Sequence, residues 1–336
     1  MKIFMIGGTG LLGAEGARIL IEKGHEVKTL SLPPIPEGSN LPEKMEISLG
    51  NYLTLSDDEI REQFRGCEGF VFAAGVDERV EAPAPIYSFF EKYNITPLRR
   101  LLRIAKECGV KHSVVLGSYF AHFNRELPEY ELTKHHPYIR SRVDQAAMAL
   151  SFDDKEMSVA VLEVPYVFGS QKGRKPVWAF LVERIRNMKD ATMYPEGGTT
   201  MVTARQIGEC IAGAIVNGAR GNVPIGYYNM EWKDMLTIFH KHMGTPHKNI
   251  VTIPAGDYIE SMKAFAEKQN RTEVEPGLDT AEFAKIFTKN LFIDKGTIVN
   301  QFDVQEDDID KAIGESVQLS LDILDGKTDA VDMKAE

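Results

Sequence analysis

Short apolar runs recur along the first half of the chain, separated by segments in which apolar residues return every three or four positions. The short runs have the length of buried strands, and the other segments have the pattern of helices with one buried face. Strands are expected around Phe4 and over 27–30, 45–47, 70–74, 113–116 and 158–162. Helices are expected over 11–23, 56–65, 86–109 and 137–151. The alternation predicts an α/β fold, a doubly wound parallel sheet with helices on both faces.

The pattern loosens after about residue 165, where a basic loop over 171–175 precedes a predicted helix over 176–188. A helix over 202–217 and a strand over 223–228 are expected to return to the main sheet. We therefore expect a core of residues 1–170, with 200–230 returning to it. The smaller substrate lobe would consist of 171–200 and 231–336, ending in an acidic amphipathic helix.

Composition narrows the classes of function. Among 336 residues, 49 are acidic and 39 are basic, and this balance disfavours broad binding to nucleic acids or anionic membranes. Cys67, Cys108 and Cys210 lie far apart without ligand spacing, so we expect no metal site and a reducing, cytoplasmic location. The apolar run before Gly7 is too short for a signal peptide, and no stretch approaches the ~20 apolar residues of a membrane span. The expected partner is a small molecule, without nucleic acid or membrane.

The first predicted strand runs directly into a glycine-rich turn at residues 7–13. Its glycines remove a Cβ where the backbone must turn sharply, approach a pyrophosphate, or let a helix pack on a strand. The following helix presents its amide dipoles to the phosphates. Because the turn lies between an apolar strand and an amphipathic helix, it predicts a dinucleotide site. The expected contacts are Gly7, Thr9, Gly10, Leu11, Leu12 and Gly13.

Later segments match one family in sequence order. They are Ala73-Ala74-Gly75 after the fourth strand, Asn94 in the fourth helix, Ser118 after the fifth strand, and the segment from Pro165 to Gly169 after the sixth. With the GxxGxxG turn, the chain resembles the short-chain dehydrogenase/reductase superfamily to about residue 230, specifically its extended or atypical branch, the NAD-dependent epimerase/dehydratase family. The resemblance implies a Rossmann-type fold with a smaller C-terminal substrate-binding lobe. It adds Ala73, Ala74, Gly75, Pro165 and Val167 as cofactor contacts.

The catalytic signature of that family, a tyrosine followed four residues later by a lysine, falls on Tyr138 and Arg142. This spacing puts both side chains on one helix face. The resemblance implies that Tyr138 exchanges a proton and that a nearby cation pulls its pKa below the usual ~10. Arg142 can supply that field and bind the nicotinamide ribose, but it cannot give up a proton in a relay. The hydroxyl that polarises the reacting oxygen falls at Ser118 or Tyr119, depending on a one-residue shift.

Cofactor preference is read from the end of the second strand. An NAD enzyme places an acidic residue there, whereas this chain has Ser31, which neither clamps a ribose diol nor repels a phosphate. NADP is therefore slightly favoured over NAD. Asn51, after the third strand, is either an adenine contact or a polar turn residue. The basic residues Lys172, Arg174 and Lys175 either bind a substrate phosphate or carboxylate, or form a solvated loop.

We consider roles for two further side chains, His122 and Glu163. His122 belongs to a group of histidines near the predicted catalytic loop and is a stand-in acid or base. The group lacks the carboxylate or thiolate spacing of a metal site. Glu163, where many relatives carry arginine, is a hypothetical buried partner for Arg142.

Together these features predict an NAD(P)-dependent oxidoreductase or epimerase acting on a small hydroxyl or carbonyl compound, with sugar nucleotides among the candidates and Tyr138 as proton donor or acceptor. The alternative is a non-catalytic NAD(P)-binding sensor or regulatory interaction protein, which the arginine at position 142 favours. The resemblance also implies a candidate homodimer through the predicted helices over 86–109 and 137–151.

Overall fold

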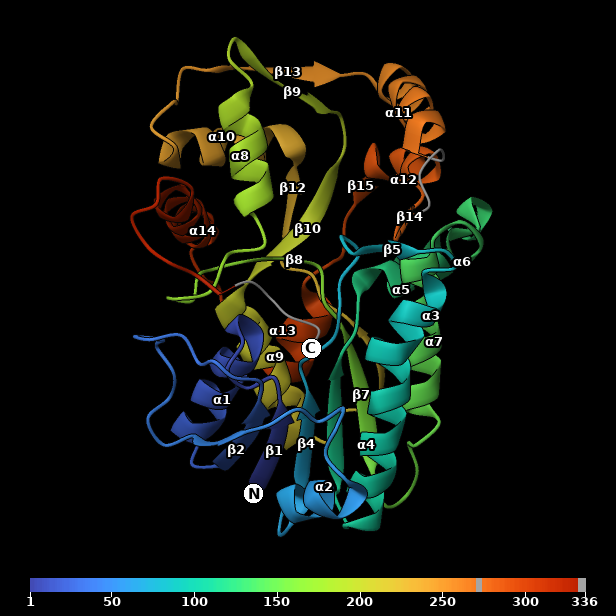
Figure 1. Cartoon of the computed structure of the whole chain (residues 1–336), viewed down its shortest axis with the longest axis vertical. Coiled ribbons are helices and arrows are strands. Elements are labelled where there is room, and N and C mark those ends of the chain that lie inside the picture. The colour runs from blue at the N-terminus through green and yellow to red at the C-terminus, as the bar shows by residue number, and fades with distance from the viewer. Residues whose placement is uncertain (270–273, 332–336) are drawn as a thin grey trace.

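The computed structural model describes residues 1–269 and 274–331. Its larger part is a seven-stranded sheet in the order β11-β7-β6-β4-β1-β2-β3, and every neighbouring pair is parallel (Figure 1). The strands are β1 (Lys2–Ile6), β2 (Glu26–Ser31), β3 (Glu46–Leu49), β4 (Gly69–Phe72), β6 (His112–Leu116), β7 (Ser158–Glu163) and β11 (Gly221–Pro224). The expected doubly wound, Rossmann-type sheet is confirmed.

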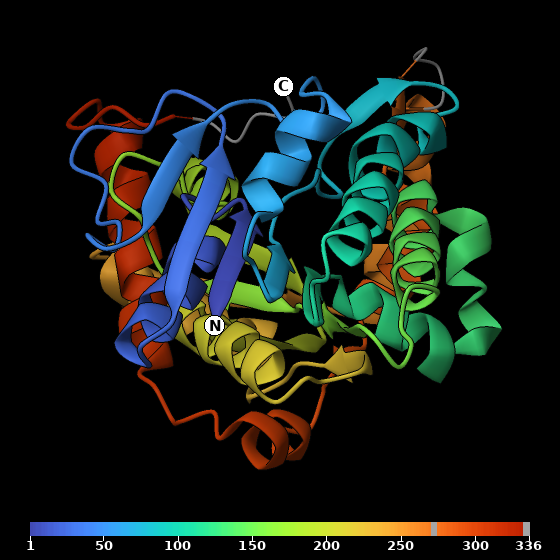
Figure 2. The same ribbon diagram turned by 90° about the horizontal axis from the view of Figure 1, so that it is seen from below.

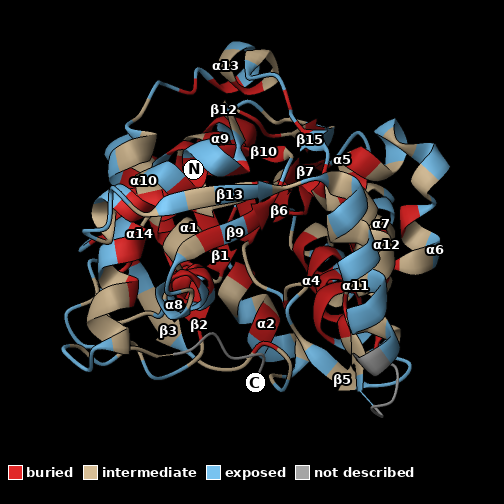
Figure 3. Ribbon diagram, turned by 90° about the horizontal axis from the view of Figure 1, so that it is seen from above, coloured by how far each residue is buried: buried red, intermediate tan, exposed pale blue. Residues whose placement is uncertain are grey.

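Helices cover both faces of this sheet (Figure 2). One face carries α1 (Leu11–Glu22) and α9 (Ala204–Val216), with α13 (Gly296–Phe302) packed on α9. The other carries α2 (Asp57–Phe64), α4 (Thr96–Glu107) and α7 (Pro137–Leu150). Side chains of β1 alternate between the two cores, because Ile3 and Met5 join the first and Phe4 and Ile6 the second. The central strands are consequently the most buried part of the molecule (Figure 3).

The long helix expected over 86–109 contains a π-helical turn. It runs as α3 (Tyr87–Phe90), η1 (Glu91–Ile95) and α4, with η1 in the π conformation. Pro97 has no N–H to donate to the carbonyl of Tyr93, which is a physical reason for the local change. The carbonyl of Asn94 instead accepts a hydrogen bond from Gln145 Nε2 on α7 at 2.6 Å. The turn therefore fixes Asn94, at the edge of the candidate site, against α7.

The smaller lobe contains short sheets and helices. One sheet joins β8 (Tyr166–Phe168), β10 (Gly198–Thr203), β12 (Tyr228–Glu231) and β15 (Asn290–Leu291), and another pairs β9 (Ala191–Pro195) with β13 (Asn249–Ile253). Its helices are α8 (Ala179–Asn187), α10 (Trp232–His242), α11 (Ala255–Gln269), α12 (Thr280–Phe287) and α14 (Ile309–Leu324). Helices α8, α10 and α14 pack together around a core that includes Trp232 and Phe239.

Short elements connect the two parts beside the carboxyl ends of the central strands. Strand β5 (Glu81–Pro83), which follows β4, pairs with β14 (Val274–Pro276). After β6 come α5 (Tyr119–Glu126), the 3₁₀ turn η2 (Pro128–Tyr130) and α6 (Leu132–His135). Within the described residues the three cysteines are free, no group of side chains is arranged to hold a metal ion, and no helix is long and apolar enough to cross a bilayer.

Close packing of α1 against α9 depends on a glycine. A Cβ built on Gly208 would lie 2.8 Å from the backbone carbon of Glu15. We expect Gly208→Ala to lower the free energy of unfolding by about 1–3 kcal/mol, because the two helices must separate. Urea titration measures this change. Gly256→Ala in α11 is the control, since nothing lies within 4 Å of its Cβ position and alanine favours a helix. Equal losses in both variants would contradict the packing explanation.

Candidate functional site

The glycine turn is built by direct backbone contact between β1 and β4. Gly7 leaves β1 with φ +87°, and a Cβ there would lie 2.3 Å from the carbonyl oxygen of Ala73. The N–H of Gly10 donates to the Gly7 carbonyl at 3.0 Å. A Cβ on Gly13 would lie 2.3 Å from that same carbonyl oxygen. Side chains at positions 7 and 13 would therefore destroy the turn.

The first turn of α1 is left without a side-chain cap. Its N-cap residue, Gly10, makes no side-chain hydrogen bond, and the first turn holds no acidic residue. The Cβ position of Gly10 has a single neighbour within 4 Å, the Gly7 carbonyl oxygen, so its surroundings are open. Uncapped N–H groups at the switch point of a parallel sheet suit a pyrophosphate. A second feature fits a bound dinucleotide: Gln171 is 7% exposed, and its Oε1 has no hydrogen-bond partner within the described residues.

The other cofactor candidates lie at the ends of strands. Ser31 closes β2 and is buried, with Oγ 3.4 Å from Thr29 Oγ1, which also accepts the N–H of Gly8. Ala73, Ala74 and Gly75 follow β4, and the N–H of Ala73 donates to Ile6 on β1. These side chains and backbone groups share one edge of the sheet with the glycine turn.

Asn51 and the segment after β7 make hydrogen bonds and strand contacts with nearby parts of the chain. Asn51 Oδ1 accepts the N–H of Leu53 at 2.9 Å, which closes a turn. Val167 lies in β8 opposite Val202, and its carbonyl accepts the indole N–H of Trp178 at 2.7 Å. Pro165 directly precedes β8.

Ser118, Tyr138 and Arg142 come together from two elements. Ser118 caps the start of α5, where its Oγ accepts the N–H of Phe120, and its hydroxyl is among the groups that lower the pKa of Tyr138 on α7. The guanidinium carbon of Arg142 lies 5.9 Å from the centre of the Tyr138 ring. All three side chains are buried.

Tyr119 faces elsewhere. Its hydroxyl accepts a hydrogen bond from Thr199 Oγ1 at 3.2 Å, and its ring packs against Phe120, Phe123 and Tyr166. Of the two alternatives left by the sequence, Ser118 is the one whose hydroxyl lowers the pKa of Tyr138.

The pKa of Tyr138 moves in the opposite direction from the sequence-based expectation. Burial raises it from 10.0 to about 12, and this effect exceeds the lowering by the charge of Arg142 and by the Ser118 hydroxyl. A phenol removed from water is hard to ionise, even beside a cation. The expectation of a lowered pKa is wrong for this structure, and Tyr138 is protonated at neutral pH.

Arg142 is anchored to the sheet by Nη2, which donates to the carbonyl of Leu116 at 2.7 Å. Its Nε is buried without a partner in the described part of the chain. Asn94, which lies close to Arg142 across Gly75, holds the loop after β4 instead: Oδ1 accepts the N–H of Val76 at 2.8 Å and Nδ2 donates to the Val76 carbonyl at 3.1 Å.

The structure adds an acidic group, Glu78, which the sequence reasoning missed. A Cβ built on Gly277 would lie 2.7 Å from the backbone carbonyl oxygen of Glu78 and 3.3 Å from the Cβ of Tyr138. Burial, followed by the charge of Asp77, raises the pKa of Glu78, while Arg142 is among the groups that lower it. The charge of Glu78 in turn raises the pKa of Tyr138. The available signal was a charged Asp-Glu-Arg triplet that follows Val76, just beyond the small residues at the end of β4.

Glu163 has a different partner from the one expected. It is fully buried, and its two carboxylate oxygens accept hydrogen bonds from Arg125 Nη1 and Nη2 at 2.8 and 2.7 Å. The hypothesis that it pairs with Arg142 is therefore wrong. His122 is partly buried, and burial lowers its pKa, so it is neutral near pH 7.

The basic loop over 171–175 lies against the glycine turn. Arg174 Nε and Gln171 Nε2 both donate to the carbonyl of Thr9, at 3.1 and 3.0 Å. These residues therefore belong to the edge of the candidate cofactor site.

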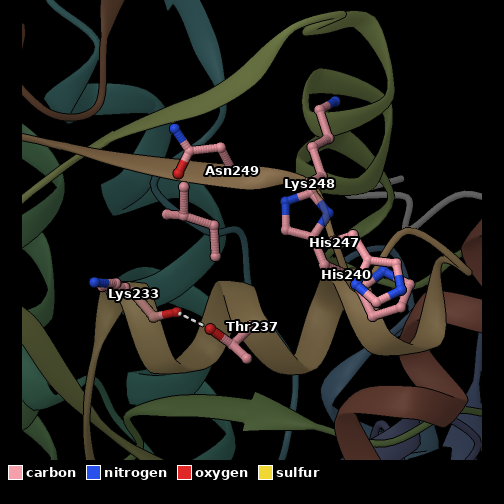
Figure 4. A pocket seen from close by; sticks show the side chains of 8 residues that line it. Lys233, Thr237, His240, His247, Lys248 and Asn249 are labelled. Atoms are coloured by element: carbon pink, nitrogen blue, oxygen red, sulfur yellow. Dashed lines mark hydrogen bonds between the residues drawn. The ribbon is translucent and has the colours of Figure 1, made fainter.

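A surface recess of about 310 Å³ lies between α10 and β13, at the far end of the smaller lobe (Figure 4). Two of its polar side chains are held by hydrogen bonds within the protein. His240 bonds Thr192 Oγ1 through Nε2 and Thr245 Oγ1 through Nδ1, each at 2.9 Å. Lys248 Nζ donates to carbonyls near the end of α8. The recess contains none of Ser118, Tyr138 and Arg142.

The raised pKa of Glu78 gives a stability prediction. The folded protein binds this proton more tightly than the unfolded chain, so ionised Glu78 costs stability at high pH, and the cost vanishes below the ordinary value of 4.5. We expect Glu78→Gln to unfold at a higher temperature than the wild type at pH 8, with the difference shrinking toward pH 4. Thermal unfolding by circular dichroism measures it, with exposed Glu129→Gln as control. If Glu78→Gln raised the unfolding temperature more at pH 4 than at pH 8, ionised Glu78 would not be the source of the lost stability.

Comparisons with known proteins bear on the family and the fold of this chain. A protein from Synechocystis sp. named as a candidate dihydroflavonol 4-reductase is 26% identical over 127 residues, which are 35% of this chain and 33% of that one. The chain thus matches about a third of that relative's length.

Solved structures share the fold across nearly the whole chain. The protein gox2253 is 18% identical, with a TM-score of 0.74 over 97% of this chain and 99% of that one. A nucleoside-diphosphate-sugar epimerase from Pseudomonas aeruginosa is 16% identical, with a TM-score of 0.69 over 96% and 98%. A UDP-glucose 4-epimerase from Bifidobacterium longum, solved with NAD⁺ and UDP, is 12% identical, with a TM-score of 0.65 over 97% and 99%. Residues 3–203 match the NAD dependent epimerase/dehydratase family, and the chain belongs to that family.

Proposed function

We propose that the protein is an NAD(P)-dependent oxidoreductase or epimerase that acts on a small hydroxyl or carbonyl compound, with Tyr138 as proton donor or acceptor. The observation that carries this proposal is the meeting of Ser118, Tyr138 and Arg142 beside the glycine turn's edge of the sheet. Family membership supports the reaction class.

In this proposal a bound nicotinamide supplies or accepts the hydride. The uncapped N–H groups of α1 and the turn at Gly7 and Gly10 hold its pyrophosphate. Ser31 lies at the adenosine ribose and, being uncharged, favours NADP over NAD.

The protein's own residues handle the proton. During reduction of a carbonyl, Tyr138 Oη donates its proton to the oxygen that becomes an alkoxide, and Ser118 orients that oxygen. The positive charge of Arg142 stabilises the phenolate left behind. Because Tyr138 is protonated at neutral pH, the site without substrate is already in the form that can donate a proton.

Two substrate classes are the first probes. UDP-glucose represents the sugar nucleotides, because a fold neighbour was solved with UDP-glucose and NAD. A dihydroflavonol represents the small carbonyl compounds, because the Synechocystis relative carries that name.

A non-catalytic NAD(P)-binding sensor is the second candidate. It is favoured by Arg142 in the position of the family lysine and by the raised pKa of Tyr138. A protein that binds a dinucleotide without oxidoreduction, and whose affinity for a protein partner changes with NADP, would support this candidate over the enzyme.

The proposal includes a cytoplasmic location and a homodimer. Free Cys67, Cys108 and Cys210 support a reducing compartment. Helices α4 and α7 are the proposed dimer interface, and the mass of the particle in solution, from light scattering, tests it.

Dinucleotide binding is the first prediction of this function. NADP⁺ or NAD⁺ at a hundred times its dissociation constant should stabilise the fold by about 2.7 kcal/mol, because it binds the folded state alone. Thermal unfolding with each dinucleotide measures this stabilisation. The absence of a shift with every oxidised and reduced form would remove both candidate functions.

Removal of the Tyr138 hydroxyl separates catalysis from binding. With UDP-glucose or a dihydroflavonol as substrate, we expect Tyr138→Phe to lower kcat/KM roughly 10²- to 10⁴-fold, while the dinucleotide dissociation constant stays unchanged. Tyr130→Phe is the matched control. Unchanged turnover in Tyr138→Phe would exclude this tyrosine as the acid.

The pKa of about 12 also sets the pH profile. Oxidation of an alcohol needs the phenolate, so kcat/KM in that direction should rise about tenfold per pH unit from pH 7 to 10. A plateau below pH 9 would show that Tyr138 ionises more easily in the working enzyme.

A further inference from the structure

The segment 171–178 crosses the edge of the sheet where a dinucleotide is expected. At its start, Gln171 and Arg174 donate to the carbonyl of Thr9 in the turn after β1, and Arg174 Nη2 also donates to Thr9 Oγ1 at 3.3 Å. At its end, the carbonyl of Val177 accepts a hydrogen bond at 3.1 Å from Arg79 Nη1, on the loop after β4. The segment therefore joins the two strand ends that flank the nucleotide crevice of this fold.

The same segment also lies against the loop that follows β2. A Cβ built on Gly173 would come 2.4 Å from Pro36 Cβ, and one built on Gly38 would come 3.2 Å from Lys172 Nζ. In this fold the end of β2 and the residues after it surround the ribose of the adenosine. Lys172 therefore reaches over the loop beyond Ser31, while Arg174 lies on the glycine turn.

The charges at this place are unbalanced. Neither Lys172 nor Arg174 forms an ion pair with any residue the structure describes. Arg174 is partly buried, and burial lowers its pKa, as expected for a cation that lacks a compensating anion. Between Ser31 and Pro42 the sequence has one carboxylate, Glu37, which is exposed.

We propose that Lys172 and Arg174 form a binding site for the 2′-phosphate of the adenosine ribose and thereby select NADP(H) over NAD(H). The inference rests on the proposed dinucleotide function and names the residues that decide between the two cofactors. A lysine supplies a mobile point charge, and an arginine already fixed by Thr9 keeps Nη1 for a phosphate oxygen. The buried, unpartnered Oε1 of Gln171 is an acceptor for a ribose hydroxyl at the same place.

A contact near the C-terminus holds this segment in place. The N–H of Val331 donates to the carbonyl of Gly173 at 2.8 Å, and the N–H of Lys175 donates to the Val331 carbonyl at 3.2 Å. These two bonds form a parallel bridge between Arg174 and Val331. Val331 thus acts as a positioning residue for both cations.

The test compares NADP⁺ and NAD⁺ binding to the full chain by isothermal titration calorimetry. The wild type should bind NADP⁺ at least tenfold more tightly than NAD⁺. Lys172→Ala should weaken NADP⁺ binding roughly tenfold or more and leave NAD⁺ binding within twofold, because a charge-assisted hydrogen bond is lost. Lys155→Ala is the matched control. Lys155 is exposed and precedes β7, at the end of the strands opposite to the one where the dinucleotide is expected. It should change neither affinity.

Arg174→Lys keeps the positive charge but removes the paired hydrogen bonds that the guanidinium makes to Thr9. It should weaken the binding of NADP⁺ more than the binding of NAD⁺. Adenosine 2′,5′-bisphosphate and 5′-AMP repeat the comparison without the nicotinamide. A wild type that prefers NAD⁺, or an equal loss for both dinucleotides in Lys172→Ala, would overturn the inference and leave the proposed function standing. A wild type that binds none of these ligands would instead remove the proposed function itself.

Discussion

The direct backbone contact between the glycine turn and the end of β4 is the constraint on which the site depends. With no Cβ at Gly7 or Gly13, the turn closes on the carbonyl of Ala73, and α1 starts immediately beside it. That contact leaves the first N–H groups of α1 open at the switch point of the sheet. It also presents the carbonyl of Thr9, on which Gln171 and Arg174 converge. One close approach thus positions both the open start of α1 and the segment that crosses it.

Burial, more than charge, governs the ionisable groups around Tyr138. Burial raises the pKa of both Tyr138 and Glu78 although Arg142 lies near both, because loss of hydration outweighs the cation's field. Tyr138 therefore keeps its proton at neutral pH. That condition suits donation to a developing alkoxide and opposes proton abstraction from an alcohol, so the direction of the chemistry depends on dielectric environment as much as on residue type.

Local periodicity and the glycine spacing were sufficient to predict the sheet, most helices and the place of the glycine turn between β1 and α1. They could not predict features that depend on contacts between remote segments. The partner of Glu163 is Arg125, and Arg174 lies on Thr9 across 165 positions of sequence. Neither pairing leaves a periodic signal. The pKa of Tyr138 was predicted in the wrong direction, because the sequence revealed the nearby cation but not the depth of burial.

Arg142, where the sequence resemblance leads one to expect a lysine, is held in place by the main sheet. The longer, forked side chain is tied to the carbonyl of Leu116 at the end of β6, so its position is set by the sheet. The side-chain amide of Asn94 makes both of its hydrogen bonds to the backbone of Val76, and so it holds the loop that carries Glu78. The π-helical turn that exposes the Asn94 carbonyl to Gln145 ties this loop to α7 as well. In this arrangement the charge of Arg142 lowers the pKa of both Tyr138 and Glu78, while the charge of Glu78 raises that of Tyr138.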